Sequence, residues 1–260
     1  MAGHDINYLA LSGVLSCLGR KHEPPLPPVN LLADFAGGSF TCAMGIMAAL
    51  LERTSSGQGQ VIDSCMVEGA AYVGSWLWSS HKSPAQLWGE PRGHNILDSG
   101  AHFYETYKTK DGKYVSVGAI EPNFYQILLE NLEVSEEDLP QFDNFDELKL
   151  KLRDIFSCKT RDDWSEIFDG TDACVVPVLD RDEARTHYHN KERNSFMLSG
   201  MPRPAPQLAR TPATPSDGPN TLDWGLHTMD ILTEMGFSCQ EIENYLQQRI
   251  VEQAEDASNI

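Results

Sequence analysis

Two short segments near the start of the chain carry the side chains best suited to proton transfer. His4 stands beside Asp5, and Asp34 follows Asn30 and precedes an Ala-Gly-Gly sequence. Imidazoles and carboxylates are the commonest general acids and bases. We therefore predict that His4 and Asp34 are the two proton-transfer groups of one active site.

Each of these residues also has a purely structural interpretation. A histidine near a chain end is usually exposed, and Asp34 is well suited to cap the helix that follows it. Glu121 lies where a strand ends and a helix begins, so it could equally be a surface or capping carboxylate. The functional interpretation depends on the combination, and spacing alone does not show that the residues converge.

The composition limits the partners of the chain. The formal net charge is −18 over 260 residues, whereas nucleic-acid binders cluster Lys and Arg, so we expect no nucleic-acid partner. Hydrophobic residues make up 41% of the chain, enough for a folded core. We find no apolar run of the roughly 20 residues that a membrane-spanning helix needs, and we expect no membrane span.

Several kinds of site are not supported. The six cysteines form no C-x-x-C pair, which favours a reduced intracellular protein with buried thiols over a disulfide framework. His187 and His189 lack Cys or carboxylate partners at zinc spacings, so we expect no metal. Motifs of serine hydrolases, P-loop NTPases and dinucleotide-binding proteins are also missing.

The first hundred residues predict helices rich in small residues. We expect a helix over 35–53, capped by Asp34, apolar nearly all round and therefore buried on most faces. A short buried strand at 61–62 and a helix over 63–78 should follow. Residues 81–100 have the composition of a loop.

The pattern changes near residue 101. Alternating residues around Asp111-Gly112 predict a β-hairpin over 103–108 and 113–118, and Pro122 fits the first turn of a helix reaching Asn131. Further elements are expected in the following ranges: helices 145–157 and 161–168, strand 173–179 and helix 180–190. We expect four parts: 1–100 in a large domain, 101–198 a small α+β domain, 199–222 a proline-rich linker and 223–260 two helices (223–235 and 239–250) with a frayed end.

Six motifs, in order, give the chain a resemblance to a known family. They are residues 2–13 (AGHDINYLALSG), 31–38 (LLADFAGG), 57–63 (GQGQVID), 92–98 (RGHNILD), 117–125 (VGAIEPNFY) and 168–178 (FDGTDACVVPV). Together they resemble the α-methylacyl-CoA racemase branch of the family III CoA-transferase superfamily. The resemblance covers the chain essentially from end to end.

The resemblance implies an α/β fold with a Rossmann-like large domain, of which this chain holds part, and a small α+β domain, in interlocked homodimers. It implies racemisation of 2-methyl-branched acyl-CoA thioesters, as in branched-chain fatty acid and bile acid metabolism, without metal or organic cofactor. His4 with Glu121, the latter from the partner subunit, would serve one face of the α-carbon and Asp34 the other. Asp5 and Asn30 would support them, and the N-terminus of the helix after Asp34 would face the thioester oxygen.

The resemblance leaves alternatives open. A family III CoA-transferase would use Asp34 as a nucleophile on the thioester. Family members carry a longer N-terminal segment that receives much of CoA, so a further alternative is an inactive truncated product that cannot bind CoA. We expect this chain to be poorly active and less stable than a complete protein. The family occurs in peroxisomes and mitochondria, although no address is legible here. Ser99 and His102 stand where Gly and Pro are expected.

Overall fold

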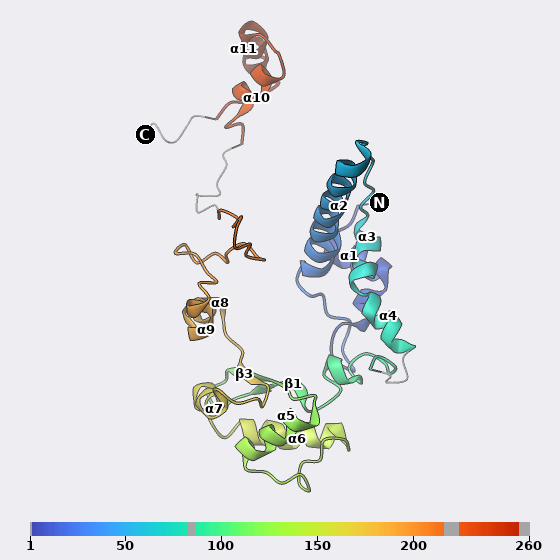
Figure 1. The fold of residues 1–260 in the computed structure, drawn as a ribbon, viewed down its shortest axis with the longest axis vertical. Coiled ribbons are helices and arrows are strands. Elements are labelled where there is room, and N and C mark those ends of the chain that lie inside the picture. Colours follow the sequence, from blue (N-terminus) through green and yellow to red (C-terminus); the bar gives the residue numbers. More distant parts are fainter. Residues whose placement is uncertain (1, 83–86, 216–223, 255–260) are drawn as a thin grey trace. The chain divides into compact units, whose positions relative to one another are not determined.

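The computed structural model describes residues 2–82, 87–215 and 224–254 of the chain. Contacts divide it into two units, Met1–Val178 and Leu179–Ile260, and each is described by itself. Figure 1 shows the order of the elements. Those of the first unit are α1 (Asp5–Ser12), the 3-10 turn η1 (Val14–Cys17), η2 (Leu31–Phe40), α2 (Thr41–Ser56), α3 (Met66–Val73), α4 (Ser75–His81), η3 (Ile96–Asp98), β1 (Tyr104–Lys108), β2 (Tyr114–Gly118), α5 (Pro122–Leu132), α6 (Phe145–Phe156), α7 (Arg161–Phe168) and β3 (Val175–Pro177).

Helices α1, η2 and α3 pack against one another around a small apolar cluster. The closest approach joins two glycines: a Cβ built on Gly69 would lie 1.8 Å from the carbonyl oxygen of Gly37. A Cβ on Gly37 would in turn lie 2.5 Å from the backbone nitrogen of Ala70. Only glycine at both positions allows this helix crossing.

The helix that carries Asp34 differs from the prediction. It begins at Leu31, not Phe35, so Asp34 lies inside its first turn, and Asn30 takes the capping position. Residues Leu31–Phe40 are π-helical and continue directly into α2. A π-helical segment is rare and often marks a functional position, and no sequence pattern predicts one.

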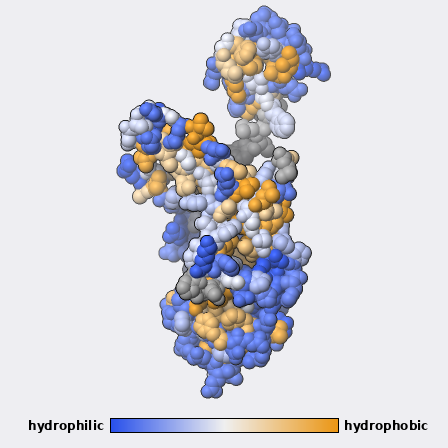
Figure 2. Space-filling model, turned by 90° about the vertical axis from the view of Figure 1, so that its right-hand side faces the viewer, coloured by the Kyte–Doolittle hydropathy of each residue, from blue (hydrophilic) through white to orange (hydrophobic). Residues whose placement is uncertain are grey.

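The expectation that this helix is buried on most faces is wrong for the described residues. No residue of α2 is buried, and Met47 and Leu51 are 64% and 72% exposed. Figure 2 shows hydrophobic residues reaching the surface in patches. The apolar pattern indicates a surface that needs a cover, and the described part of the chain does not supply it.

Among the described residues, one helical stretch meets the length and composition of a membrane span. Leu31–Ser56 has 26 residues; its most apolar 18 residues have a mean hydropathy of 1.4, and 11% of those residues are buried. Core helices of other proteins meet the same criteria. The stretch therefore carries no assignment to a membrane.

Two further expectations in this part fail. Val61 and Ile62 are exposed and form no strand, and the following helix starts at Met66 instead of Asp63. That helix is also interrupted at Gly74, where a Cβ would lie 2.7 Å from a methyl group of Val14. Tight packing against η1 thus replaces the continuous helix that the sequence predicts.

The β-hairpin is confirmed. Strands β1 and β2 pair antiparallel with Tyr104 opposite Gly118, and β3 adds antiparallel to β2. Helix α5 starts at Pro122 as predicted. The helices α5, α6 and α7 complete an aromatic and aliphatic core that includes Phe103 and Phe156, both fully buried.

Ion pairs join the hairpin region to the N-terminal segment within the first unit. The Arg20 guanidinium donates to both carboxylate oxygens of Glu105, at 2.5 and 2.7 Å, and the Glu105 side chain is 6% exposed. Lys21 pairs with Asp146 on α6. A bidentate Arg–carboxylate pair fixes orientation as well as distance.

The second unit contains helices α8 (Arg181–Thr186), α9 (Tyr188–Glu192), α10 (Thr228–Glu234) and α11 (Cys239–Gln247). Ser238 and Glu241 form the capping box predicted for α11. Part of the predicted linker (216–223) and most of the predicted frayed end (255–260) lie outside the described residues. All six cysteines are free, and four of them are exposed, so the expectation of buried thiols is wrong.

His102, which stands where proline was expected, is fully buried. Its Nε2 lies 2.8 Å from the hydroxyl of Tyr125, which donates to the carbonyl of Leu139 at 2.9 Å. Because the hydroxyl has one proton, Nε2 must donate to it, and the imidazole is the neutral Nε2–H form. Burial, and secondly the positive charge of Lys149, lower the pKa of His102 from 6.5 to about 4.

The glycine crossing predicts a sharp difference between two Gly→Ala variants. Gly69→Ala should lower the free energy of unfolding by about 3 kcal/mol, because overpacking at a rigid backbone contact separates η2 from α3. Gly59→Ala meets nothing within 4 Å and should be neutral. Urea unfolding of both variants measures the difference, and equal midpoints would contradict the crossing.

Buried His102 predicts how stability depends on pH. Between about pH 4 and pH 6.5 the unfolded chain binds a proton at His102 that the folded chain does not, so stability falls as pH drops through this window. A shift of this size corresponds to about 3 kcal/mol. Thermal and urea unfolding at pH 4.5 and 7.5 measure how much stability depends on pH. Most of this dependence should be lost in His102→Phe and kept in His189→Gln, which changes an exposed residue. An unchanged pH dependence in His102→Phe would refute the assignment.

Candidate active site

His4 lies at the N-cap of α1 and is exposed. Its backbone N–H donates to the side-chain oxygen of Asn7 at 3.1 Å. This bond fixes the backbone of His4 at the start of the helix while its ring remains open to solvent. An exposed imidazole on a fixed backbone can meet a substrate without rearrangement of the chain.

Asp34 lies in the first turn of the π-helical segment and is half-buried. One of its carboxylate oxygens accepts from the side-chain amide of Asn30 at 3.1 Å. Asn30 thus orients the carboxylate from one side. The sequence placed Asn30 in a supporting role, and the structure brings it into contact with Asp34.

Asp5 connects the two segments. Its carboxylate is 3% exposed, and Oδ2 accepts from the backbone N–H of Ala33 at 2.7 Å and of Asp34 at 2.8 Å. Since Asp5 follows His4 directly, these bonds bring the start of α1 to the start of η2. His4 and Asp34, 30 positions apart in the sequence, are therefore held at one end of the α1–η2 pair.

The bonds to Asp5 occupy backbone N–H groups at the start of η2 that we expected to be available to a substrate. We expected these amide groups to face the oxygen of a thioester. Instead the N–H groups of Ala33 and Asp34 are bound to the Asp5 carboxylate. The partial positive charge of the helix N-terminus therefore stabilises Asp5.

Glu121 lies apart from this group in the described structure. It is exposed at the N-cap of α5, directly after β2, and no described contact joins it to His4 or Asp34. Desolvation, and secondly the charge of Glu121, raise the pKa of the Cys174 thiol. Glu121 thus faces the end of the small sheet.

Among the residues that the structure describes, no group of three His, Cys, Asp or Glu side chains is placed to hold a metal ion. At the α1–η2 junction, Oδ2 of Asp5 accepts from two backbone amides and the Asp34 carboxylate accepts from Asn30, while Oδ1 of Asp5 is buried without a hydrogen-bond partner among the described residues.

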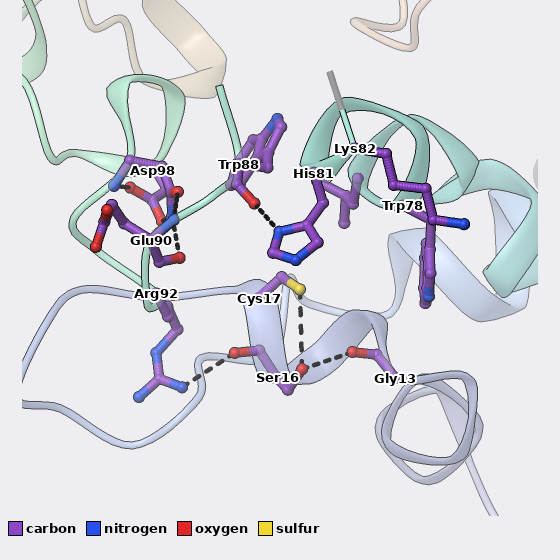
Figure 3. Close-up of a pocket in the computed structure, with 12 residues that line it drawn as sticks. Gly13, Ser16, Cys17, Trp78, His81, Lys82, Trp88, Glu90, Arg92 and Asp98 are labelled. Atoms are coloured by element: carbon purple, nitrogen blue, oxygen red, sulfur yellow. Dashed lines mark hydrogen bonds between the residues drawn. The ribbon is translucent and has the colours of Figure 1, made fainter. Parts of the chain in front are cut away.

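A separate cavity of about 490 Å³ lies at the far end of α1 (Figure 3). We did not predict it. The available signal was the RGHNILD motif: buried Asn95 bonds the backbone of Glu90 and Pro91, and Asp98 accepts from Gly93 and Asn95. These bonds hold the loop that forms one wall.

The family model for the family III CoA-transferases matches residues 1–225. The chain belongs to this family. It is 55% identical to the mouse protein named alpha-methylacyl-CoA racemase over 100% of this chain and 69% of that protein. The human protein of the same name is 53% identical over 97% of this chain and 67% of its own length.

Solved structures support the fold of this family member. A CAIB/BAIF family protein from Brucella suis superposes with a TM-score of 0.65 at 19% identity, covering 90% of this chain and 63% of that chain. The hypothetical protein Rv3272 from Mycobacterium tuberculosis gives a TM-score of 0.61 at 18% identity, covering 82% and 58%. This chain spans less than two thirds of both structures.

The Asp5 contact predicts a measurable loss of stability. Asp5→Ala leaves two backbone N–H groups without an acceptor and should cost about 3 kcal/mol, whereas Asp5→Asn keeps one oxygen and should cost about half as much. Asp63→Ala, at an exposed position, is the matched control. If urea unfolding finds Asp5→Ala no worse than Asp63→Ala, Asp5 does not join α1 to η2.

Proposed function

We propose that this chain carries the proton-transfer site of an isomerase that racemises the α-carbon of 2-methyl-branched acyl-CoA thioesters. The observation that carries the proposal is the Asp5 bridge, which brings His4 and Asp34 to one end of the α1–η2 pair. The two racemases that are more than half identical to this chain support the reaction class.

The chemistry follows from the acidity of the substrate. A proton α to a thioester is weakly acidic, so its removal needs a positioned base and stabilisation of an enolate-like state. In one direction neutral His4 removes the proton and protonated Asp34 delivers one to the opposite face. In the other direction the two groups exchange roles, so one site serves both enantiomers.

Glu121 has its role in a dimer under this proposal. It is exposed at the end of the small sheet and touches neither His4 nor Asp34 in the described chain. We propose that it reaches His4 of a second copy and stabilises the imidazolium form. The homodimer is part of the proposal.

The proposed reaction needs no metal and no organic cofactor, since CoA is part of the substrate and proton transfer uses side chains alone. The similarity to racemases also supports a role in branched-chain fatty acid and bile acid metabolism, with the enzyme in peroxisomes or mitochondria. Fractionation of cells expressing the tagged protein tests the compartment.

Uptake of deuterium from D2O into the α-carbon of a 2-methylacyl-CoA tests the reaction on the 260-residue chain. His4→Ala should lower racemisation about 100-fold or more, the range for loss of a general base. Asp34→Asn should still exchange the proton of one enantiomer through His4, but without inversion. Glu121→Gln should also lower racemisation, because Glu121 stabilises the imidazolium form of His4 under this proposal. His189→Ala is the surface control for His4→Ala, and Glu130→Gln is the surface control for Glu121→Gln.

The outcomes separate racemisation from CoA transfer. No uptake by the unmodified chain contradicts the proposal for this chain, and unchanged uptake in His4→Ala refutes the role of His4. A CoA-transferase would instead form a thioester between CoA and Asp34. A CoA adduct on the peptide that contains Asp34, found by mass spectrometry, would favour that second function.

A further inference from the structure

The cavity at the far end of α1 is distinct from the proton-transfer site. His4 caps the start of α1, and Gly13, which lines the cavity, caps its end. Eight helical residues span about 12 Å, so the two sites lie on opposite ends of one helix. A volume of about 490 Å³ is in the range of small-molecule sites.

One wall of the cavity is an exposed indole that is nonetheless held in place. Trp78 is 46% exposed, yet a Cβ on Gly13 would lie 3.4 Å from its ring and a Cβ on Gly74 3.0 Å from it. The ring therefore packs across two glycines and leaves its remaining surface to the cavity. Leu77 and Trp88 add further apolar surface.

Several polar groups of the lining are already engaged. Arg92 donates to the carbonyls of Ser16 and Glu23, and the Asp98 carboxylate accepts from three donors of its own loop. These bonds build the wall, while Nε of Arg92 and Nε1 of Trp88 are buried donors without a hydrogen-bond partner among the described residues. The cavity is therefore preformed by hydrogen bonds on one side and by packing on the other.

His81 offers an acceptor to a ligand in the cavity. Its Nδ1 lies 2.8 Å from the carbonyl oxygen of Trp88, and because a carbonyl can only accept, Nδ1 carries the proton. In the neutral ring Nε2 is then a free acceptor. Figure 3 shows the ring of His81 and the thiol of Cys17 extending into the space between α4 and η1.

We propose that this cavity binds an uncharged aromatic molecule that carries a hydroxyl group. The aromatic body packs against Trp78, and the hydroxyl donates to Nε2 of His81. The lining holds two cations, Lys82 and Arg92, and two carboxylates, Glu90 and Asp98, so its charges balance and favour an uncharged ligand. Aromatic pairs add to the energy of apolar burial, which favours a ring over an alkyl chain.

The rate of Cys17 alkylation by iodoacetamide, followed by peptide mass spectrometry, reports occupancy. The probe is 2-naphthol, and it should slow the alkylation of Cys17 at least tenfold at saturation without slowing that of exposed Cys158. 2-Methoxynaphthalene, which has the ring but no donor, and anionic 2-naphthoate should each bind about fivefold or more weakly, as expected for one neutral hydrogen bond.

Variants separate the two contacts. Trp78→Ala should abolish the protection and Trp78→Leu should weaken it, whereas Trp76→Ala, an exposed indole outside the lining, should keep it. His81→Phe should bind 2-naphthol and 2-methoxynaphthalene equally. Circular dichroism and melting curves of each variant identify any that fail to fold.

Three results would overturn the proposal. The first is a rate of Cys17 alkylation by iodoacetamide that 2-naphthol leaves unchanged, and the second is equal slowing at Cys158. The third is a preference for 2-naphthol over 2-methoxynaphthalene that persists in folded His81→Phe. The probes contain no thioester, so these results are independent of racemisation. An active racemase without this binding would refute the cavity proposal alone.

Discussion

The acceptance of two backbone N–H groups by the buried Asp5 carboxylate is the constraint on which the N-terminal part of the structure depends. A buried carboxylate is costly unless hydrogen bonds compensate it, and the start of η2 supplies two such bonds at 2.7 and 2.8 Å. The bonds set the position of α1 against η2. Both proton-transfer candidates follow from that position, since His4 precedes Asp5 and Asp34 donates one of the bonds.

Polar groups join the remaining parts of the first unit in the same way. Asn95 and Asp98 bond the backbone of their own loop, and Glu105 accepts both arms of Arg20. Each of these side chains is largely shielded from solvent and has several hydrogen-bond partners. Its burial therefore fixes the position of the surrounding backbone without leaving it unpaired. The apolar contacts then fill the space that these bonds define.

Local signals predicted much of the fold. Asp111-Gly112 gave the hairpin, Pro122 gave the start of α5, and Ser238 with Glu241 gave the start of α11, because each signal acts within a few residues. The resemblance also named Asn30 as a supporting residue, and the structure places its side-chain amide 3.1 Å from the Asp34 carboxylate. The resemblance to family III CoA-transferases supplied the family.

Features that depend on distant segments were not predictable from the sequence. The π-helical segment, the break at Gly74 and the cavity beside Trp78 each require a neighbour that no local pattern names. The exposure of α2 was missed because hydrophobic periodicity reports that a face needs a partner and cannot show whether one is present. The position of Glu121 relative to His4 was likewise not predictable, since it depends on where α5 lies relative to α1.

The π-helical segment has a consequence for how this part of the chain can vary. Consecutive residues of an α-helix are turned by about 100°, whereas the wider π turn brings Asp34 toward Asn30 while the helix beyond it keeps Thr41 near Gly37. Removing one residue between Asp34 and Thr41 would restore the α-helical repeat. Either Asp34 would then turn away from Asn30, or Thr41 would turn away from Gly37. The number of residues in this segment is therefore constrained as tightly as the glycine at position 37.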